Sequence, residues 1–170
     1  NVLVWNMYKG LKKNWEKDFT KLSQNHDLLI TQEMAMTGRM QEIFETELAF
    51  EFSSATSFFN DGKGRTGVAT ISKTPSILQI YQRSKYREPL IKTPKVVLIT
   101  TYPLSNGETL MIANIHAVNF VSVIELLDQI RTVVKVLNNH NGPAIFGGDF
   151  NTWSKRKTRD MRKILSSANM

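Results

Sequence analysis

Pro143-Ala144-Ile145-Phe146-Gly147-Gly148-Asp149-Phe150-Asn151 is the stretch around which the rest of the chain can be interpreted. Its apolar start predicts a short buried strand at 144–146, and the two glycines predict a sharp turn where that strand ends. Asp149 and Asn151 lie two residues apart, so an extended backbone would point both side chains to the same side. A carboxylate beside a carboxamide suits a hard divalent cation or a positioned water. The alternative is an Asx turn, in which both side chains bond only to their own backbone.

Polar side chains also follow three other predicted strand regions. They are Asn6 after 2–5, Glu33 after 28–30, and His116 with Asn119 after the hairpin of 96–101 and 109–115. Each has an ordinary explanation when taken alone: an asparagine that forms a turn, a solvated glutamate, or a hydrogen-bonded structural histidine. The order in which these residues occur along the chain is what favours a common site.

Strands outnumber helices in the predicted secondary structure. Apolar residues recur at three- and four-residue steps over 123–137, which indicates the clearest helix, and a last helix follows a capping serine at 154. The strands occur both as hairpins and as strand-helix-strand units. Two sheets packed face to face with helices outside would bury their apolar faces, so we predict an α+β fold of that kind.

Composition fits one globular domain over residues 1–170, with 41% hydrophobic residues and no cysteine. The absence of cysteine excludes a disulfide framework, a thiolate metal site and a cysteine nucleophile. No apolar run approaches the length needed to cross a bilayer and no export signal is present, so we expect a cytoplasmic protein without membrane insertion. The formal net charge of +7 favours a polyanionic partner, either nucleic acid or an anionic membrane surface. No pattern indicates an oligomeric state.

Basic residues cluster directly after the opening stretch. Lys155-Arg156-Lys157-Thr158-Arg159 is followed one turn later by Arg162 and Lys163. Such a run usually forms a solvated helix face, but its closeness to Asn151 favours phosphate binding. Lys155 and Arg156 are therefore candidate substrate-binding residues.

Five short blocks together resemble the endonuclease/exonuclease/phosphatase superfamily. They are Trp5-Asn6, Gln32-Glu33, Gly67-Val68-Ala69, Asn114-Ile115-His116 and Gly147-Gly148-Asp149-Phe150-Asn151. The last block is the most specific, and the pattern runs through almost the whole chain. In detail the sequence is similar to the bacterial YafD-like branch, through residues 5–9 and 114–120.

This resemblance implies a DNase I-like fold, a four-layer αββα sandwich with its site on the rim where the sheets meet. It also implies phosphoester hydrolysis assisted by Mg²⁺ or Mn²⁺. Glu33 would be the main metal ligand with Asn6 nearby. Asp149 would orient or deprotonate the attacking water, and Asn151 would hold the phosphate or the water.

The resemblance further implies a role for His116, which would donate a hydrogen bond or proton to the phosphate or leaving group. Arg87-Glu88-Pro89 is similar to a segment of pancreatic deoxyribonuclease, and this likeness implies that Glu88 orients His116. Asn119 would be a phosphate contact.

One feature departs from the superfamily pattern. Members carry a late Ser-Asp-His block, and this sequence has no such block; besides His116 it contains only His26 and His140, both in predicted loops. We therefore expect a truncated domain that lacks its C-terminal strands, and an inactive domain is compatible with this expectation.

Three functions remain compatible with these residues. The first is a metal-dependent nuclease for DNA or RNA, which the basic charge favours. The second is a phosphodiesterase or phosphatase acting on a phospholipid or another small phosphorylated substrate. The third is a non-catalytic domain that binds nucleic acid or a protein.

Overall fold

The computed structural model describes residues 1–43, 46, 48–60, 64–89 and 92–170. Its elements in chain order are β1 (Val2–Asn6), the 3₁₀ turn η1 (Tyr8–Gly10), α1 (Trp15–Ser23), β2 (Leu28–Met36), α2 (Gly38–Glu42), β3 (Glu51–Asn60), β4 (Gly64–Ser72), β5 (Leu78–Arg87), β6 (Pro94–Pro103), β7 (Thr109–His116), α3 (Val123–Asn138), β8 (Ala144–Asp149) and α4 (Lys155–Ser167).

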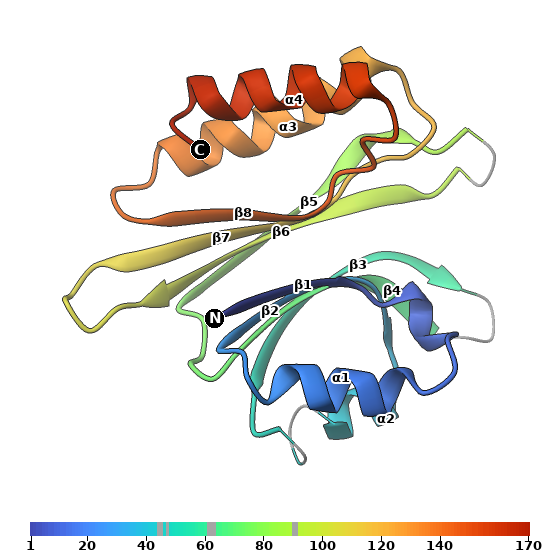
Figure 1. Cartoon of the computed structure of the whole chain (residues 1–170), viewed down its shortest axis with the longest axis vertical. Coiled ribbons are helices and arrows are strands. Elements are labelled where there is room, and N and C mark those ends of the chain that lie inside the picture. Colours follow the sequence, from blue (N-terminus) through green and yellow to red (C-terminus); the bar gives the residue numbers. More distant parts are fainter. Residues whose placement is uncertain (44–45, 47, 61–63, 90–91) are drawn as a thin grey trace.

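The strands form two four-stranded sheets, which we call sheet A (β1-β2-β4-β3) and sheet B (β5-β6-β7-β8). One outer pair of each sheet is parallel, β1 with β2 in sheet A and β7 with β8 in sheet B, and the other pairs are antiparallel. Figure 1 shows the two sheets face to face, with α1 and α2 beneath sheet A and with α3 and α4 covering sheet B. The predicted α+β class and the four-layer αββα order are therefore confirmed.

Apolar side chains fill all three spaces between the four layers. Leu126, Ile130 and Val134 of α3 pack on sheet B, and Phe19 of α1 packs on sheet A. Between the sheets, Ile30 of β2 meets Ile112 of β7. The helix over 123–138 begins at a capping box, in which Ser122 and Glu125 bond reciprocally to each other's backbone N–H groups, as a stable N-terminus requires.

Two predicted strand ends differ from the structure. The strand predicted at 28–30 continues to Met36, so Glu33 lies inside β2. Gly147 and Gly148 belong to β8 and form no turn, because they pair with Asn114 and Ile115 of β7. A Cβ at Gly148, whose φ is +139°, would stand 2.0 Å from the carbonyl oxygen of Ile115, so close backbone approach explains this glycine.

None of the helices in the described ranges is long and apolar enough to cross a lipid bilayer.

Candidate active site

Parallel pairing brings the ends of four strands to one rim of the sandwich. In sheet B, β7 and β8 are in register so that His116 stands opposite Asp149. In sheet A, β1 and β2 place Asn6 opposite Gln32, next to Glu33. Parallel strands deliver their carboxyl ends to the same edge, and β1 of sheet A packs near β8 of sheet B. The four side chains predicted to converge therefore do so.

Asn6 joins the two carboxylates of the site across the sheets. Its Nδ2 donates to Asp149 Oδ2 at 2.9 Å and to Glu33 Oε1 at 3.4 Å. Its Oδ1 accepts the backbone N–H of Tyr8 at 3.0 Å. In this orientation Asn6 uses its amide hydrogens to hold both carboxylates in place, and its oxygen faces the backbone. Its role as a metal ligand stays a prediction.

His116 is buried beside the same two carboxylates. Its Nε2 lies 4.0 Å from Glu33 Oε1 and 4.0 Å from Asp149 Oδ2. Burial, together with the nearby Lys95 ammonium, lowers the pKa of His116 to about 4, although Asp149, Glu33 and Glu88 oppose the change. The imidazole is therefore neutral at pH 7. It can donate one hydrogen bond from a ring N–H, as a neutral histidine does.

Glu33 reaches the rim through an irregularity in β2. The pairing of β2 with β4 shifts register between Thr31 and Met34, and Glu33 itself has a φ of 49°. A bulge of this kind re-aims a side chain, and a positive φ on a non-glycine residue is a strained conformation. The carboxylate is thus placed by distortion of the strand.

The Glu33 carboxylate is only partly satisfied. Its Oε2 is buried and accepts no well-directed hydrogen bond, while Lys9 Nζ lies 3.2 Å away as an ion-pair partner. Burial by itself would raise the pKa of Glu33, but Lys9, His116 and Asn6 together hold the pKa below its ordinary value. Glu33 is therefore ionised, with an oxygen available to a cation.

Asp149 and Asn151 combine the two arrangements that the sequence left open. Asp149 Oδ1 accepts the backbone N–H of Asn151 at 3.0 Å, which is an Asx-type contact, while Oδ2 faces Asn6. Asn151 has a φ of 49°, so the backbone is not extended there. Its Nδ2 donates to the Ala117 carbonyl at 2.8 Å and its Oδ1 accepts from Trp153 Nε1 at 3.1 Å. In this conformation Asn151 fixes the loop, and its contact with phosphate or water stays a prediction.

The donor set suits a hard divalent cation. Glu33, His116 and Asp149 converge, but among the described residues no three His, Cys, Asp or Glu side chains are arranged so that together they could hold a metal ion. Mg²⁺ needs fewer protein ligands than that, because it retains several waters and takes one or two carboxylates. Glu33 is the carboxylate that fits this description, because its Oε2 is buried without a hydrogen bond and already has a cation, the Lys9 ammonium, 3.2 Å away.

Glu88 lies in a different setting from the one predicted. Its Oε2 accepts from Thr93 Oγ1 at 3.0 Å, and its Oε1 pairs with Lys95 Nζ at 3.2 Å. In the described part of the chain no hydrogen bond joins Glu88 to His116, which corrects the expected orienting contact. The physical reason is Lys95, a buried lysine that satisfies the glutamate and whose charge also acts on His116.

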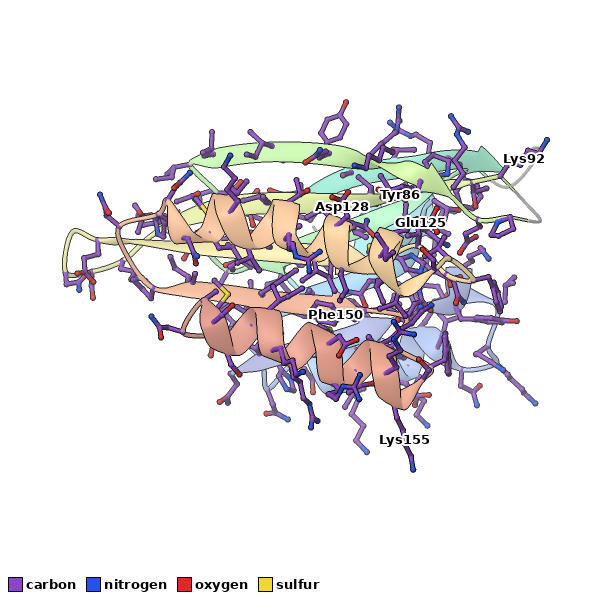
Figure 2. The ribbon with its side chains drawn as sticks, turned by 90° about the horizontal axis from the view of Figure 1, so that it is seen from above. Tyr86, Lys92, Glu125, Asp128, Phe150 and Lys155 are labelled. Carbon is purple, nitrogen blue, oxygen red and sulfur yellow. The ribbon has the colours of Figure 1, made fainter. Side chains whose placement is uncertain are left out.

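The three predicted substrate-binding residues lie outside the cluster of Asn6, Glu33, His116 and Asp149. Asn119 is half-buried, and its Oδ1 accepts the backbone N–H of Phe120 at 2.8 Å. Lys155 and Arg156 are exposed in the first turn of α4, and Figure 2 shows Lys155 directed away from the sheets. Arg156 Nε lies 3.8 Å from Asp160 Oδ2. Their contact with substrate stays a prediction.

Sequence reasoning missed the polar contact that ties the sheets together below the site. Gln32 Nε2 donates to Asn114 Oδ1 at 2.9 Å, and Asn114 Nδ2 donates to the carbonyls of Thr31 and Ala69 at 3.1 and 2.9 Å. All three bonds are buried. Two amides inside otherwise apolar strands were the available signal, because such groups must find partners.

Two packed sheets with these residues on their common rim define a DNase I-like sandwich. The chain belongs to the Endonuclease/Exonuclease/phosphatase family, whose sequence profile matches residues 3–166. It is 39% identical to a UPF0294 protein of Vibrio campbellii and 35% identical to one of Vibrio parahaemolyticus. Both alignments cover 100% of this chain and 59% of the relative, so the chain spans about three fifths of the length of these curated relatives.

Solved structures with the same fold cover nearly the whole chain at low identity. An endonuclease/exonuclease/phosphatase family protein from Leptotrichia buccalis has a TM-score of 0.70 at 15% identity, over 98% of this chain and 72% of its own. The human Nocturnin catalytic domain with bound sulfate has a TM-score of 0.68 at 17% identity, over 98% and 69%. Beta toxin from Staphylococcus aureus with bound magnesium has a TM-score of 0.69 at 17% identity, over 96% and 69%.

Proposed function

We propose that this protein is a nuclease that hydrolyses phosphodiester bonds of nucleic acid with the help of Mg²⁺ or Mn²⁺. The observation that carries the proposal is the cluster at the rim: Asn6 bonds both carboxylates, and His116 lies 4.0 Å from each of them. Membership of a family of phosphoester hydrolases supports the same reaction class.

The side chains of the cluster divide the work of water attack on phosphorus. Asp149 is held by Asn6 and by the backbone of Asn151, so its carboxylate is oriented to position a water or take its proton. His116 is neutral at pH 7 and acts by donating a hydrogen bond to a phosphate oxygen, where charge builds during the reaction. Of the two roles predicted for His116, we therefore favour donation of a hydrogen bond over donation of a proton.

Glu33, with Asn6 nearby, would hold the metal, as the unmatched Oε2 supports. When bound, a divalent cation would neutralise charge on the phosphoryl oxygens. Beta toxin was solved with magnesium, and Nocturnin with a sulfate anion, and both share this fold. Ion binding by two proteins of this fold supports a metal-assisted reaction in this chain.

Charge favours nucleic acid over a small phosphodiester. The chain has a net charge of +7. A shallow, open surface groove lies on α4 and the loop before it, starting at Thr152 and Trp153, and its lining includes the basic residues Lys155, Arg159, Arg162 and Lys163. Arg159 also pairs with Asp160 of the same helix, Nε to Oδ1 at 2.9 Å. A row of cations that starts next to Asn151 and continues along α4 fits a polyanion better than a single phosphate group.

The test compares supercoiled plasmid and short RNA with a soluble phosphodiester and phosphoinositides, each in Mg²⁺, Mn²⁺ or EDTA. We expect nicking of plasmid or cutting of RNA that needs the metal and is lost in Asp149→Asn. Cleavage that persists in EDTA would contradict the metal role. Turnover of phosphoinositides alone would assign the small-substrate alternative, and binding of nucleic acid without turnover of any substrate would assign the non-catalytic one.

A further inference from the structure

Three aromatic side chains are exposed on the loops that surround the candidate active site. Tyr8 follows β1, Phe120 follows β7 and Trp153 follows β8, and they are 50%, 72% and 79% exposed. Each lies one or two residues after a residue considered above, namely Asn6, Asn119 or Asn151. Large exposed aromatic rings cost solvation free energy, so three on one rim indicate a surface that is covered when a partner binds.

The chain holds these rings in defined positions. Trp153 Nε1 donates to Asn151 Oδ1 at 3.1 Å, which leaves the faces of the indole open. Tyr8 and Phe120 both have positive φ values, 48° and 55°, which are strained conformations for residues other than glycine.

Positive charge accompanies the aromatic residues. Lys12 Nζ and Lys9 Nζ lie 5.0 and 5.9 Å from the centre of the Tyr8 ring. Trp153 itself lines the basic groove of α4, next to Lys155 and Arg159. The groove therefore joins the Trp153 indole to a row of cations, and it starts at Thr152, the residue after Asn151.

We infer that Tyr8, Phe120 and Trp153, which we call the aromatic rim, stack the unpaired bases of single-stranded nucleic acid while the α4 groove holds its phosphates. Stacking rings combined with a cationic track are the two features by which proteins bind single strands. A regular duplex would offer phosphates to the groove but would keep its bases away from the rings. The inference rests on the proposed nuclease function and narrows its substrate to single-stranded or locally opened segments.

A binding experiment in EDTA separates bases from charge. Three fluorescent probes are compared by anisotropy: oligothymidylate, an abasic deoxyribose-phosphate strand and a blunt duplex. Each is about 12 units long, a length within the range of single-strand binding sites. The abasic strand matches the first probe in charge and lacks only the bases. We expect oligothymidylate to bind about tenfold or more tightly than either of the others, which is the range reported for stacking of one or two bases. Equal binding of the oligothymidylate and abasic strands would overturn the inference.

Variants assign the preference to particular rings. Trp153→Ala and Phe120→Ala should each weaken oligothymidylate binding about tenfold and leave binding of the abasic strand unchanged, whereas Trp153→Phe should restore most of the affinity. Tyr81→Ala is the matched control, because Tyr81 is 59% exposed on β5 and belongs to neither the rim nor the groove. Loss of abasic and oligothymidylate binding together in Trp153→Ala would show a structural effect and contradict stacking.

Quenching of tryptophan emission gives a direct readout. Of the three tryptophans, Trp5 and Trp15 are half-buried and Trp153 is exposed, so oligothymidylate should quench the emission and the abasic strand should not. Vesicles of anionic phospholipid are tested in parallel. Tighter binding to vesicles that is lost in Phe120→Ala would overturn the inference in favour of a membrane surface. If the protein cleaves plasmid but the rim variants bind oligothymidylate as the unchanged protein does, base stacking by the aromatic rim is rejected and the nuclease proposal stands. If the rim variants lose oligothymidylate binding but the protein cleaves no nucleic acid, only the nuclease proposal is rejected.

Discussion

Sheets A and B follow the same plan but deliver their site residues in different ways. Each sheet has a parallel outer pair followed by antiparallel strands, β1 with β2 in sheet A and β8 with β7 in sheet B. In sheet B, regular register places His116 opposite Asp149. In sheet A, Glu33 is placed by a register shift and a positive φ, and one of its carboxylate oxygens lacks a hydrogen bond.

This difference in backbone strain and hydrogen bonding suggests that the two halves of the site have different roles. The sheet B half of the site is built without strain at Asp149, and its carboxylate is fully engaged by Asn6 and the Asn151 backbone. The sheet A half carries backbone strain and a buried carboxylate oxygen that lacks a hydrogen bond, each of which costs free energy in the unliganded protein. We interpret the sheet A half as the place that binds the cation, and the sheet B half as the place that positions the water.

The largest expected effect comes from Glu33→Gln compared with Asp149→Asn. Both should lower kcat: Asp149→Asn by about 10²–10⁴-fold, the range for loss of a general acid-base group, and Glu33→Gln because the metal would be held less well. If the two halves differ as described, Glu33→Gln should also raise the Mg²⁺ concentration for half-maximal activity by about tenfold or more, because loss of a ligand weakens metal binding. Asp149→Asn should leave that concentration unchanged. Metal titrations of plasmid nicking measure both, and equal shifts in the two variants would remove the distinction.

The buried tie between the sheets gives the next effect. Asn114→Ala removes three hydrogen bonds and leaves the Thr31 carbonyl and one donor of Gln32 without these partners. We expect a loss of about 2–3 kcal/mol in the free energy of unfolding, as for buried groups left unsatisfied. Asn138→Ala, at the exposed end of α3, is the matched control and should stay within about 0.5 kcal/mol. Urea unfolding checks both, and similar values would show that the tie contributes little.

The burial of His116 predicts a dependence of stability on pH. Its pKa is about 4 in the folded protein against 6.5 for the ordinary group, so the unfolded chain binds more protons between these values. The stability present above pH 6.5 should therefore fall as the pH drops toward 4, by about 2 kcal/mol between pH 7 and pH 5. The His116→Asn variant should not show this decrease in the free energy of unfolding between pH 7 and pH 5. Urea midpoints in EDTA at several pH values measure it, and parallel curves for both proteins would contradict the burial account.

The sequence was sufficient to predict the four residues of the central cluster, because strand ends and their order determine the rim, but it also assigned to the site Glu88, Asn119, Lys155 and Arg156, which lie outside that cluster. Asn6, Glu33, His116 and Asp149 were all identified from short polar residues placed after apolar runs. The backbone geometry that positions these side chains was not predictable, because a bulge such as the one at Glu33 depends on the register between β2 and β4. The two glycines of β8 predicted a turn, since their sequence does not reveal the carbonyl that a side chain would meet.

Glu88 shows the same limit for side-chain partners. The similarity of Arg87-Glu88-Pro89 to a segment of pancreatic deoxyribonuclease predicted contact of Glu88 with His116, but in the structure Glu88 pairs with Lys95. A lysine in an apolar run is usually expected to reach solvent, so its burial could not be anticipated. The register shift of β5 against β6 between Arg83 and Arg87 also lies beyond any pattern in the sequence.

The smallest effect tests the strain itself. At an ordinary strand position glycine is less stable than alanine by about 0.5–1 kcal/mol. At φ 49° this order should reverse, because alanine pays for the left-handed conformation and glycine does not. We therefore expect Glu33→Gly to be more stable than Glu33→Ala by about 1 kcal/mol, although both lack the carboxylate. Asp149, whose φ is ordinary, supplies the control pair, and there Asp149→Gly should be the less stable. Denaturant unfolding of the four variants decides the matter: the same order at both positions would mean that Glu33 is held without strain and that the two sheets do not differ in this respect.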